Sequence, residues 1–343
     1  ADWDGFAQRR AESSARGKLR GRGIGQYLEV TGPPAPEMGG IRFEADGTVT
    51  IITGTLDYGQ GHATPFAQIL ASRLGVPFER IRLLQGDSDE MLAGGGTGGS
   101  KSLMASGTAI VESSGAVIEQ GRKIAAHVLE AATADIEFDI GPAGGRFRIA
   151  GTDREIGIME LADRLRAGLS LPDDVPQTLS VSKVTASPPF AYPNGCHIAE
   201  VEVDPETGIV QVVKYTMVND FGVVVNPMLV AGQAHGGVAQ GIGQALLEHV
   251  VYDEDGQMMT GSYMDYALPR ADLMPGFSIT SHPVPAKTNV LGSKGCGEAG
   301  CAGALPSVMN ALVDALAPLG VRHIDMPATP EKVWQAIQAA KSA

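Results

Sequence analysis

The chain has 343 residues, and its 26 lysines and arginines stand against 39 aspartates and glutamates, which gives a formal net charge of −13. This surplus of acid repels phosphate backbones and anionic lipid surfaces, so we expect neither nucleic acid nor a membrane as a partner. The length allows two lobes, because single hydrophobic cores stop growing at roughly 250–300 residues.

Three features of the sequence indicate where the protein is located and whether it is part of a longer polypeptide. Cys196, Cys296 and Cys301 form no CxxC pair and no four-ligand set, so neither a structural zinc site nor an iron–sulfur cluster can be built from them. We expect a cytoplasmic protein, with no apolar run near the ~20 residues that span a bilayer. The chain begins at Ala1 in a charged, helix-like stretch, which we interpret as a piece of a longer polypeptide or a processed subunit.

The pattern divides the chain into an N-terminal arm at 1–40 and two lobes at 41–185 and 186–343. Residues 1–24 are basic and polar and are interpreted as an arm or helix, a solvated surface segment rather than a binding site. In the first lobe, 48–53 and 80–85 are predicted strands. They flank a helix that Thr64 can cap, with Pro65 in its first turn, so a crossover unit is expected.

A long helix is predicted after the glycine-rich segment 94–99, followed by an irregular, polar passage from about 135 to 187. The second lobe opens with alternation, in which Ala199, Val201 and Val203 point inward and Glu200, Glu202 and Asp204 outward. A turn at 205–208 makes this a hairpin. A glycine-rich helix at Asn226-Pro227 and two more helices complete an α+β fold, two lobes of mixed sheet packed with helices.

Two glycine-rich segments precede predicted helices. Gly59, Gln60, Gly61 and His62 stand at a helix N-terminus, where free amides favour a phosphate. An ordinary strand-to-helix turn with a solvent-facing histidine is the better explanation of a glycine pair alone. The second segment runs through Thr97, Gly98, Gly99, Ser100, Lys101 and Ser102 and can wrap an anionic ligand. It lacks the Walker spacing, and a flexible linker is the alternative.

Two further segments contain unusual polar groups. Gln233, Gly237, Gln240 and Gln244 share one helix face that suits a polar ligand better than an apolar core, with glycine-mediated helix packing on the opposite face. Glu298 is flanked by glycines and followed by a helix expected to begin near Pro306. A carboxylate partly desolvated there would have a raised pKa suited to a general base, whereas a surface loop glutamate is the alternative.

Together the four segments resemble the C-terminal half of the molybdopterin-binding large subunit of the xanthine oxidase family, which includes aldehyde oxidoreductases and aerobic carbon monoxide dehydrogenases. The most specific stretches are Gly59 to His62, Gly96 to Ser102, Gly232 to Gly243, and Lys294 to Gly300. The resemblance implies a second molybdenum-cofactor-binding domain, with molybdenum held by the pterin dithiolene rather than by side chains.

The same resemblance implies a role for each matching residue. Glu298 would be the catalytic base in the oxidation of an aldehyde or N-heterocycle with water as the oxygen source. Molybdopterin, expected in its cytosine dinucleotide form, would contact residues of all four segments: Gln60, Gly61, His62, Thr97, Gly98, Gly99, Ser100, Lys101, Ser102, Gln240, Lys294, Gly295, Cys296 and Gly297. Cys296 and Cys301 stand where the family often has other small residues. We expect no role for them, and the alternative is that a thiol near the metal tunes the pocket.

The resemblance also implies partners, because the family's large subunit is about twice as long as this chain. A chain or segment carrying the first half of the molybdenum domain, a [2Fe-2S] subunit and an FAD subunit are expected. Two other hypotheses remain. One is a non-catalytic cofactor carrier or scaffold, which the presence of Glu298 argues against. The other is a nucleotide-binding protein that uses the glycine loop for an ordinary phosphate.

Overall fold

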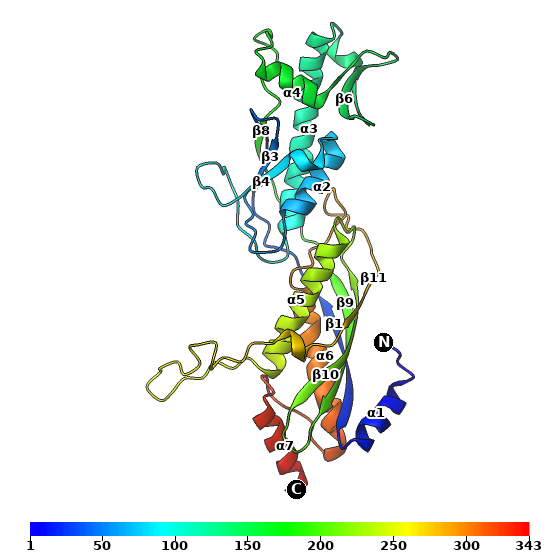
Figure 1. Ribbon diagram of the computed structural model, residues 1–343, viewed down its shortest axis with the longest axis vertical. Helices are drawn as coiled ribbons and strands as arrows, with labels where there is room; N and C mark the ends of the chain where they lie inside the picture. Colours follow the sequence, from blue (N-terminus) through cyan, green and yellow to red (C-terminus); the bar gives the residue numbers. More distant parts are fainter. Residues whose placement is uncertain (343) are drawn as a thin grey trace.

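The computed structural model describes residues 1–342, which form an elongated molecule with two cores arranged along its length (Figure 1). The α-helices are α1 (Phe6–Ala15), α2 (Ala63–Leu74), α3 (Ser102–Val128), α4 (Ile158–Arg166), α5 (Pro227–Leu246), α6 (Ala299–Leu316) and α7 (Pro330–Ser342). Short 3₁₀ turns lie at Phe78–Arg80, Thr133–Asp135, Ala271–Leu273 and Ala317–Leu319. The expectation of mixed sheets packed with helices is confirmed.

The first core contains a four-stranded sheet in the order β4-β3-β2-β8. These strands are β2 (Glu37–Phe43), β3 (Val49–Thr53), β4 (Ile81–Leu84) and β8 (Val181–Thr185). The parallel pairing of β3 with β4 around α2 is the predicted crossover unit. The helix begins at Ala63, with His62 as its N-cap residue, so the predicted cap at Thr64 is wrong by two residues.

The segment 135–187 was predicted to be an irregular passage, and this prediction is wrong. It forms a three-stranded antiparallel sheet of β5 (Ile136–Gly141), β6 (Gly144–Ile149) and β7 (Glu155–Gly157), then α4 and β8. Phe147, Ile156 and Leu161 are buried in the first core with the far end of α3. The strands are short, so three to six residues of alternation between polar residues gave little signal.

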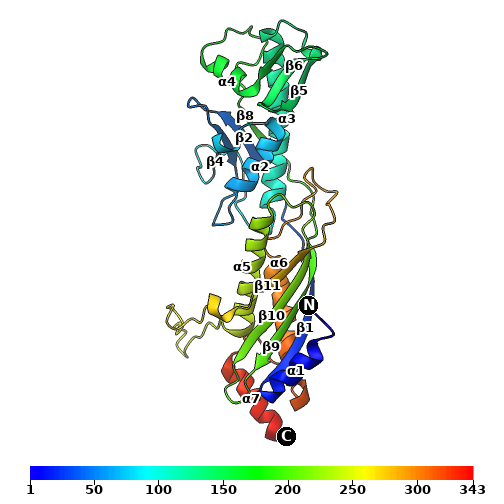
Figure 2. The ribbon, with the colours of Figure 1, turned by 45° about the vertical axis from the view of Figure 1, so that its right-hand side comes forward.

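The second core contains the sheet β1-β9-β10-β11, formed by β1 (Leu19–Leu28), β9 (Asn194–Val203), β10 (Val210–Asp220) and β11 (Phe277–Ser281). The predicted hairpin of β9 and β10 is present. Helix α6 lies along β1 and β9 and packs against α5 (Figure 2). The alternating glycines of β1 allow this contact: a Cβ on Gly21 would stand 2.0 Å from the Ala311 carbonyl oxygen, and one on Gly23 only 2.2 Å from the Ala311 nitrogen.

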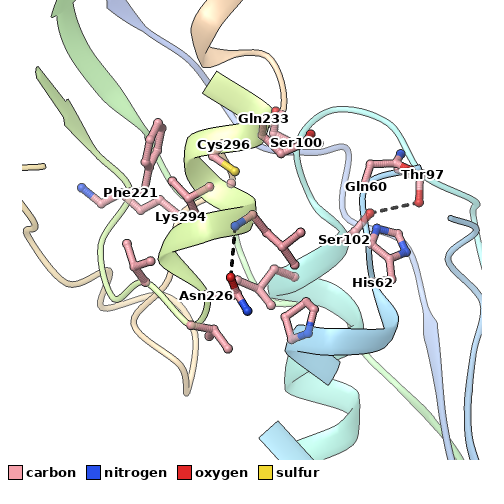
Figure 3. Close-up of a pocket in the computed structure, with 18 of the residues that line it drawn as sticks. Gln60, His62, Thr97, Ser100, Ser102, Phe221, Asn226, Gln233, Lys294 and Cys296 are labelled. Carbon is pink, nitrogen blue, oxygen red and sulfur yellow. Dashed lines mark hydrogen bonds between the residues drawn. The ribbon is translucent and has the colours of Figure 1, made fainter. Parts of the chain in front are cut away.

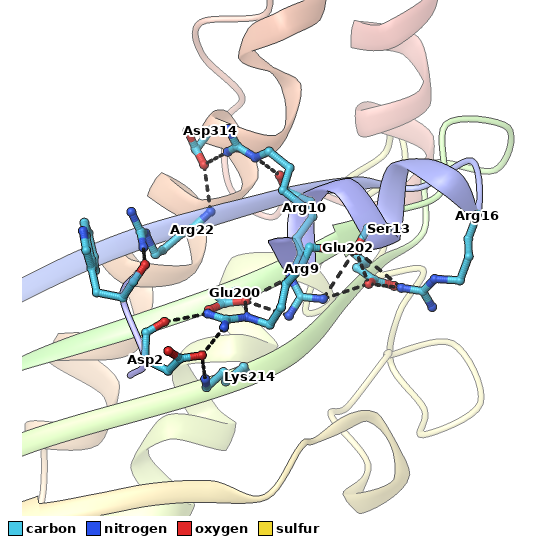
Figure 4. Close-up of polar contacts among 12 residues, drawn as sticks. Asp2, Arg9, Arg10, Ser13, Arg16, Arg22, Glu200, Glu202, Lys214 and Asp314 are labelled. Atoms are coloured by element: carbon cyan, nitrogen blue, oxygen red, sulfur yellow. Dashed lines mark hydrogen bonds and ion pairs between the residues drawn. The ribbon is translucent and has the colours of Figure 1, made fainter. Parts of the chain in front are cut away.

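The N-terminal segment contains the predicted helix as α1, but it is not a solvated arm, because β1 is a strand of the second sheet. β1 pairs antiparallel with β9 from Leu19↔Val203 to Leu28↔Asn194, and α1 covers the outer face of these strands. Glu200 and Glu202, which we expected to face outward, are buried beneath α1 (Figure 4). Arg20 Nη2 lies 2.7 Å from Glu200 Oε2, and Ser13 Oγ donates to Glu202 Oε1 at 2.6 Å. The arginines of this segment neutralise buried carboxylates.

Helix α6 is also longer and more apolar than predicted. Residues Ala299–Leu319 have a mean hydropathy of 1.3 and are long and apolar enough to cross a membrane by length and composition alone. The expectation that the chain has no such run is therefore wrong. In the fold, Ala304, Val308 and Leu312 are buried in the second core, and this packing accounts for the apolar composition of the helix.

Candidate functional site

A cavity of about 300 Å³ lies where segments of the two cores meet (Figure 3). The N-terminal ends of α2 and α3 contribute one side, and α5 with the loop before α6 contributes the other. Most of the predicted site residues line it: Gln60, His62, Thr97, Gly98, Gly99, Ser100, Ser102, Lys294, Gly295, Cys296, Gly297 and Glu298. The four sequence segments, far apart in the chain, thus converge on one cavity.

Three predicted residues do not line this cavity: Gly61, Lys101 and Gln240. The Lys101 ammonium lies near Gly95 and interacts with the buried carboxyl of Glu37. Gln240 is exposed further along α5. On the same helix, Gln233 does line the cavity, and its helical spacing to Gln240 was the signal that pointed to it. Whether any of these residues contacts a cofactor stays a prediction.

The glycines of α5 differ from the expected division into two faces. Gly237, which was assigned to the ligand face, packs against α6: a Cβ there would stand 2.9 Å from the Gly300 Cα. Gly241 also faces α6, whereas a Cβ on Gly236 would meet no described atom within 4 Å outside the neighbouring helix backbone. The residues of α5 nearer its N-terminus, Leu229, Val230 and Gln233, are those that reach the cavity.

The segment 57–62 holds an anion that belongs to the chain itself. Asp57 Oδ1 accepts hydrogen bonds from the amides of Gly59 at 2.7 Å and Gly61 at 3.2 Å, and Asp57 Oδ2 accepts from the His62 amide at 2.7 Å. Burial opposes ionisation of Asp57, but these three amides outweigh it and lower the pKa of the carboxyl. The expectation that these amides bind a phosphate is therefore wrong, because Asp57 already occupies them.

His62 is buried at the N-terminus of α2, where its ring stacks on Phe66 with the ring centroids 5.1 Å apart. Its Nδ1 is 3.4 Å from Gln85 Nε2. Burial lowers the pKa of His62, so the imidazole is neutral at neutral pH and can both donate and accept a hydrogen bond. It lines the cavity as a polar neutral group rather than as a cation.

Ser100 connects the glycine loop to Glu298. Its backbone is in the left-handed region with φ 55°. The Ser100 Oγ accepts a hydrogen bond from the Glu298 amide at 3.0 Å and donates one to Glu298 Oε2 at 3.1 Å. Gly295 permits this approach, since a Cβ there would stand 1.7 Å from the Ser100 carbonyl oxygen. The loop 94–101 and the loop 294–298 are therefore locked together at the cavity.

Glu298 is the N-cap residue of α6, which begins at Ala299 and not near Pro306 as predicted. Proline is common in the first turn of a helix, but Pro306 lies inside this one. Glu298 is exposed, so the expected partial desolvation is not present in this chain. The Glu298 side chain makes no hydrogen bond to the amides of α6, and its Oε2 accepts the hydrogen bond from Ser100 Oγ.

The remaining groups of the second loop are neutral or neutralised. The Lys294 ammonium forms an ion pair with Asp220, and both side chains are largely buried. Burial, with a smaller contribution from Glu29, raises the pKa of the Cys296 thiol to about 11, so the sulfur stays protonated and unreactive at neutral pH. The cavity therefore offers hydroxyls, amides and a neutral imidazole, with Glu298 as its free carboxylate among the lining residues.

The chain belongs to the molybdopterin cofactor-binding domain family, whose model matches residues 1–275. It is 36% identical over 355 residues to the nicotine 6-hydroxylase large subunit of Paenarthrobacter nicotinovorans. The aligned region covers 98% of this chain and 42% of that protein. It is 33% identical over 344 residues to the carbon monoxide dehydrogenase large chain of Hydrogenophaga pseudoflava, which covers 97% of this chain and 42% of that protein.

Among solved structures, quinoline 2-oxidoreductase from Pseudomonas putida 86 superposes with a TM-score of 0.86 at 33% identity, over 98% of this chain and 44% of that one. The chain thus spans less than half the length of these relatives. The resemblance to the C-terminal part of molybdenum hydroxylase large subunits is confirmed.

Polar groups line one part of the cavity, and apolar side chains, among them Phe66, Phe221 and Val224, line the rest. A Cβ on Gly98 would meet no atom of the described chain within 4 Å, so the backbone of this lining loop is open to a ligand. The side chains of Gln60, Gln233 and His62 offer donors and acceptors for the amide-like edges of a pterin. Thr97 Oγ1 and Ser102 Oγ, 3.0 Å apart, add two hydroxyls at the N-terminus of α3. These groups suit the family's cofactor without supplying a metal ligand.

Proposed function

We propose that this chain is the cofactor-binding and base-supplying part of a molybdenum hydroxylase that oxidises an aldehyde or an N-heterocycle, with water as the oxygen source. The observation that carries the proposal is the Ser100–Glu298 contact, which holds a carboxylate at the cavity that the four segments line. A carrier that only stores the cofactor needs no proton acceptor there.

The residues of this chain have distinct tasks in the proposed reaction. The bound cofactor supplies the two-electron redox chemistry. Glu298 accepts a proton at its carboxylate, and the Ser100 hydroxyl fixes the orientation of Oε2. Gln60, Gln233 and the neutral His62 orient the cofactor, and the ion pair of Lys294 with Asp220 fixes the loop that leads to Glu298.

The cofactor form and the partners are further parts of the proposal. We expect the cytosine dinucleotide form of molybdopterin, a partner chain or segment with the first half of the molybdenum domain, and [2Fe-2S] and FAD subunits. The names of the relatives support the expectation of partner chains, since they are a "large subunit" and a "large chain". The exposed position of Glu298 also supports it, because a covering segment would complete the site.

The proposal is tested by Glu298→Gln in the purified complex, together with metal and pterin analysis. The variant keeps the volume of the side chain but removes the proton acceptor. We expect turnover to fall by about 10²-fold or more, the range for loss of a general base, with molybdenum and pterin contents unchanged. The matched control is Glu206→Gln, an exposed glutamate in the turn between β9 and β10, which should leave turnover unchanged.

Two outcomes would contradict the proposal. Unchanged turnover of the Glu298→Gln complex would favour the cofactor carrier. A bound mononucleotide, with neither molybdenum nor pterin in the purified protein, would favour a nucleotide-binding protein. Mass spectrometry of co-purifying chains identifies the partners in the same preparation.

A further inference from the structure

The residue after β1, Glu29, is fixed beside the candidate site by the segments around it. Its amide donates to the Pro193 carbonyl at 2.9 Å, which extends the pairing of β1 with the chain that leads into β9. Three residues later, the Gly32 amide donates to the Gly99 carbonyl at 2.9 Å. This attachment brings the turn after β1 against the glycine loop, and the Glu29 side chain lies beside Ser100 and Glu298.

The carboxyl group of Glu29 is in an unusual state for an acidic side chain. Both of its oxygens are buried, and neither has a hydrogen-bond partner that meets ordinary geometry among the described residues. A buried ionised carboxylate without partners is strongly unfavourable, so such a group either acquires a partner or keeps its proton.

The charged and titratable groups around Glu29 do not favour its ionisation. Tyr27 lies near the end of β1, two residues before Glu29, and Cys296 and Glu298 lie on the loop before α6. No lysine or arginine among the described residues acts on it. Burial first, and then Glu298, raise the pKa of Glu29 to about 7, although the Ser100 hydroxyl opposes this increase.

We propose that Glu29 is a positioning residue that shares one proton with Glu298, so that the two carboxyl groups and Ser100 act as a single unit. In the acidic form, protonated Glu29 donates a hydrogen bond to the Glu298 carboxylate. In the alkaline form, Glu29 releases that proton to solvent, and its negative charge faces Glu298. This inference rests on the proposed function for its effect on turnover, but the shared proton does not depend on turnover.

The two forms differ in how readily Glu298 accepts a proton. A hydrogen bond from neutral Glu29 stabilises the Glu298 carboxylate and weakens it as a base, whereas a second negative charge strengthens it. Glu298 should therefore become a stronger base as the pH rises through about 7, the value to which the pKa of Glu29 is raised. The pair titrates as one system, so this step belongs to both residues.

Infrared difference spectroscopy of the purified complex tests the shared proton directly, because a protonated carboxyl has a carbonyl band that the ionised form lacks. We expect a band that disappears with a midpoint near pH 7 in the wild type. Glu29→Gln should remove it. Glu298→Gln should keep it but move its midpoint to lower pH, because the like charge is gone. The matched control is Glu37→Gln, which removes a second buried glutamate with a raised pKa and should leave the band of Glu29 unchanged.

The pH dependence of turnover is the second readout. Glu29→Gln keeps a neutral hydrogen-bond donor at all pH values, so its turnover should match that of the wild type below pH 7 and fall about three- to tenfold behind it above pH 7. A band unaffected by Glu29→Gln, or a midpoint unaffected by Glu298→Gln, would overturn the inference. If Glu298→Gln does not impair turnover, the proposed function fails, whatever the infrared result.

Discussion

Ser100 and Glu298 are joined by two hydrogen bonds: the Ser100 hydroxyl accepts one from the Glu298 amide at 3.0 Å and donates one to the Glu298 carboxylate at 3.1 Å. The first bond satisfies an amide at the N-terminal end of α6, and the second orients the candidate base. The same hydroxyl therefore stabilises a helix of the second core and arranges the functional site. Because it comes from the loop before α3, it also joins segments of both cores.

Ser100→Ala should show how much the Ser100 hydroxyl contributes to the stability of α6 and how much it contributes to the orientation of Glu298. Loss of the amide acceptor should lower the free energy of unfolding by about 1 kcal/mol, as for other helix caps. Loss of the bond to Oε2 should reduce turnover about tenfold, because a misoriented base reacts less often. Thermal unfolding and steady-state kinetics of the complex measure both. A variant that loses stability but turns over normally would show that Ser100 serves only the helix.

The buried ion pairs beneath α1 predict how stability depends on pH. Burial opposes ionisation of Glu200, but hydrogen bonds from Arg9 and Arg20 outweigh it and lower its pKa in the folded state. A carboxyl with a lowered folded pKa contributes stability above its unfolded pKa, about 4.3, and this contribution is lost as the pH falls through the folded value.

Glu200→Gln should therefore destabilise the protein at neutral pH by about 3–5 kcal/mol, because two arginines lose a buried partner. It should also lose less further stability than the wild type below pH 4. Thermal unfolding from pH 7 to pH 3 compares the two, with Glu206→Gln as an exposed control. Parallel curves for wild type and Glu200→Gln would show that other carboxylates control acid unfolding.

Sequence patterns predicted the elements whose signal is local. The crossover unit at 48–85, the long helix after the glycine loop and the β9–β10 hairpin each have several turns or strand residues of regular pattern. The four site segments were also identifiable from their clusters of glycine next to polar groups, although Gly237 and Gly241 in fact pack against α6. Their convergence on one cavity depends on the packing of distant elements and came from the resemblance alone.

The wrong predictions concern segments whose structure depends on residues far away in the chain, which a local pattern does not reveal. The arginines around β1 indicated a surface segment, yet Gly21, Gly23 and Gly25 alternate at the period of a strand, and α6 occupies the space that their missing side chains leave. Asp57 likewise gave no sign in isolation that it would occupy the amides of 59–62. The Glu29 carboxyl oxygens are buried, and its segment is held in place by backbone hydrogen bonds to Pro193 and to Gly99, both distant in the chain.

Gly295 sets the distance between the two loops that meet at Ser100. A Cβ at this position would stand 1.7 Å from the Ser100 carbonyl oxygen, and 2.7 Å from the Ser100 Cβ, so the loops must separate to accept any side chain. Gly295→Ala should therefore break both Ser100–Glu298 hydrogen bonds at once. We expect turnover to fall at least as far as in Ser100→Ala, with a lower cofactor content, because both loops line the cavity.

The matched control is Gly236→Ala on α5, where a Cβ would meet no described atom within 4 Å. Alanine is favoured over glycine inside a helix by about 1 kcal/mol, so this control should raise the unfolding temperature and leave the cofactor content unchanged. Molybdenum and pterin analysis, with kinetics of both complexes, makes the comparison. Full cofactor content and normal turnover in Gly295→Ala would mean that the loops tolerate separation, and that Glu298 does not need Ser100 to reach its working position.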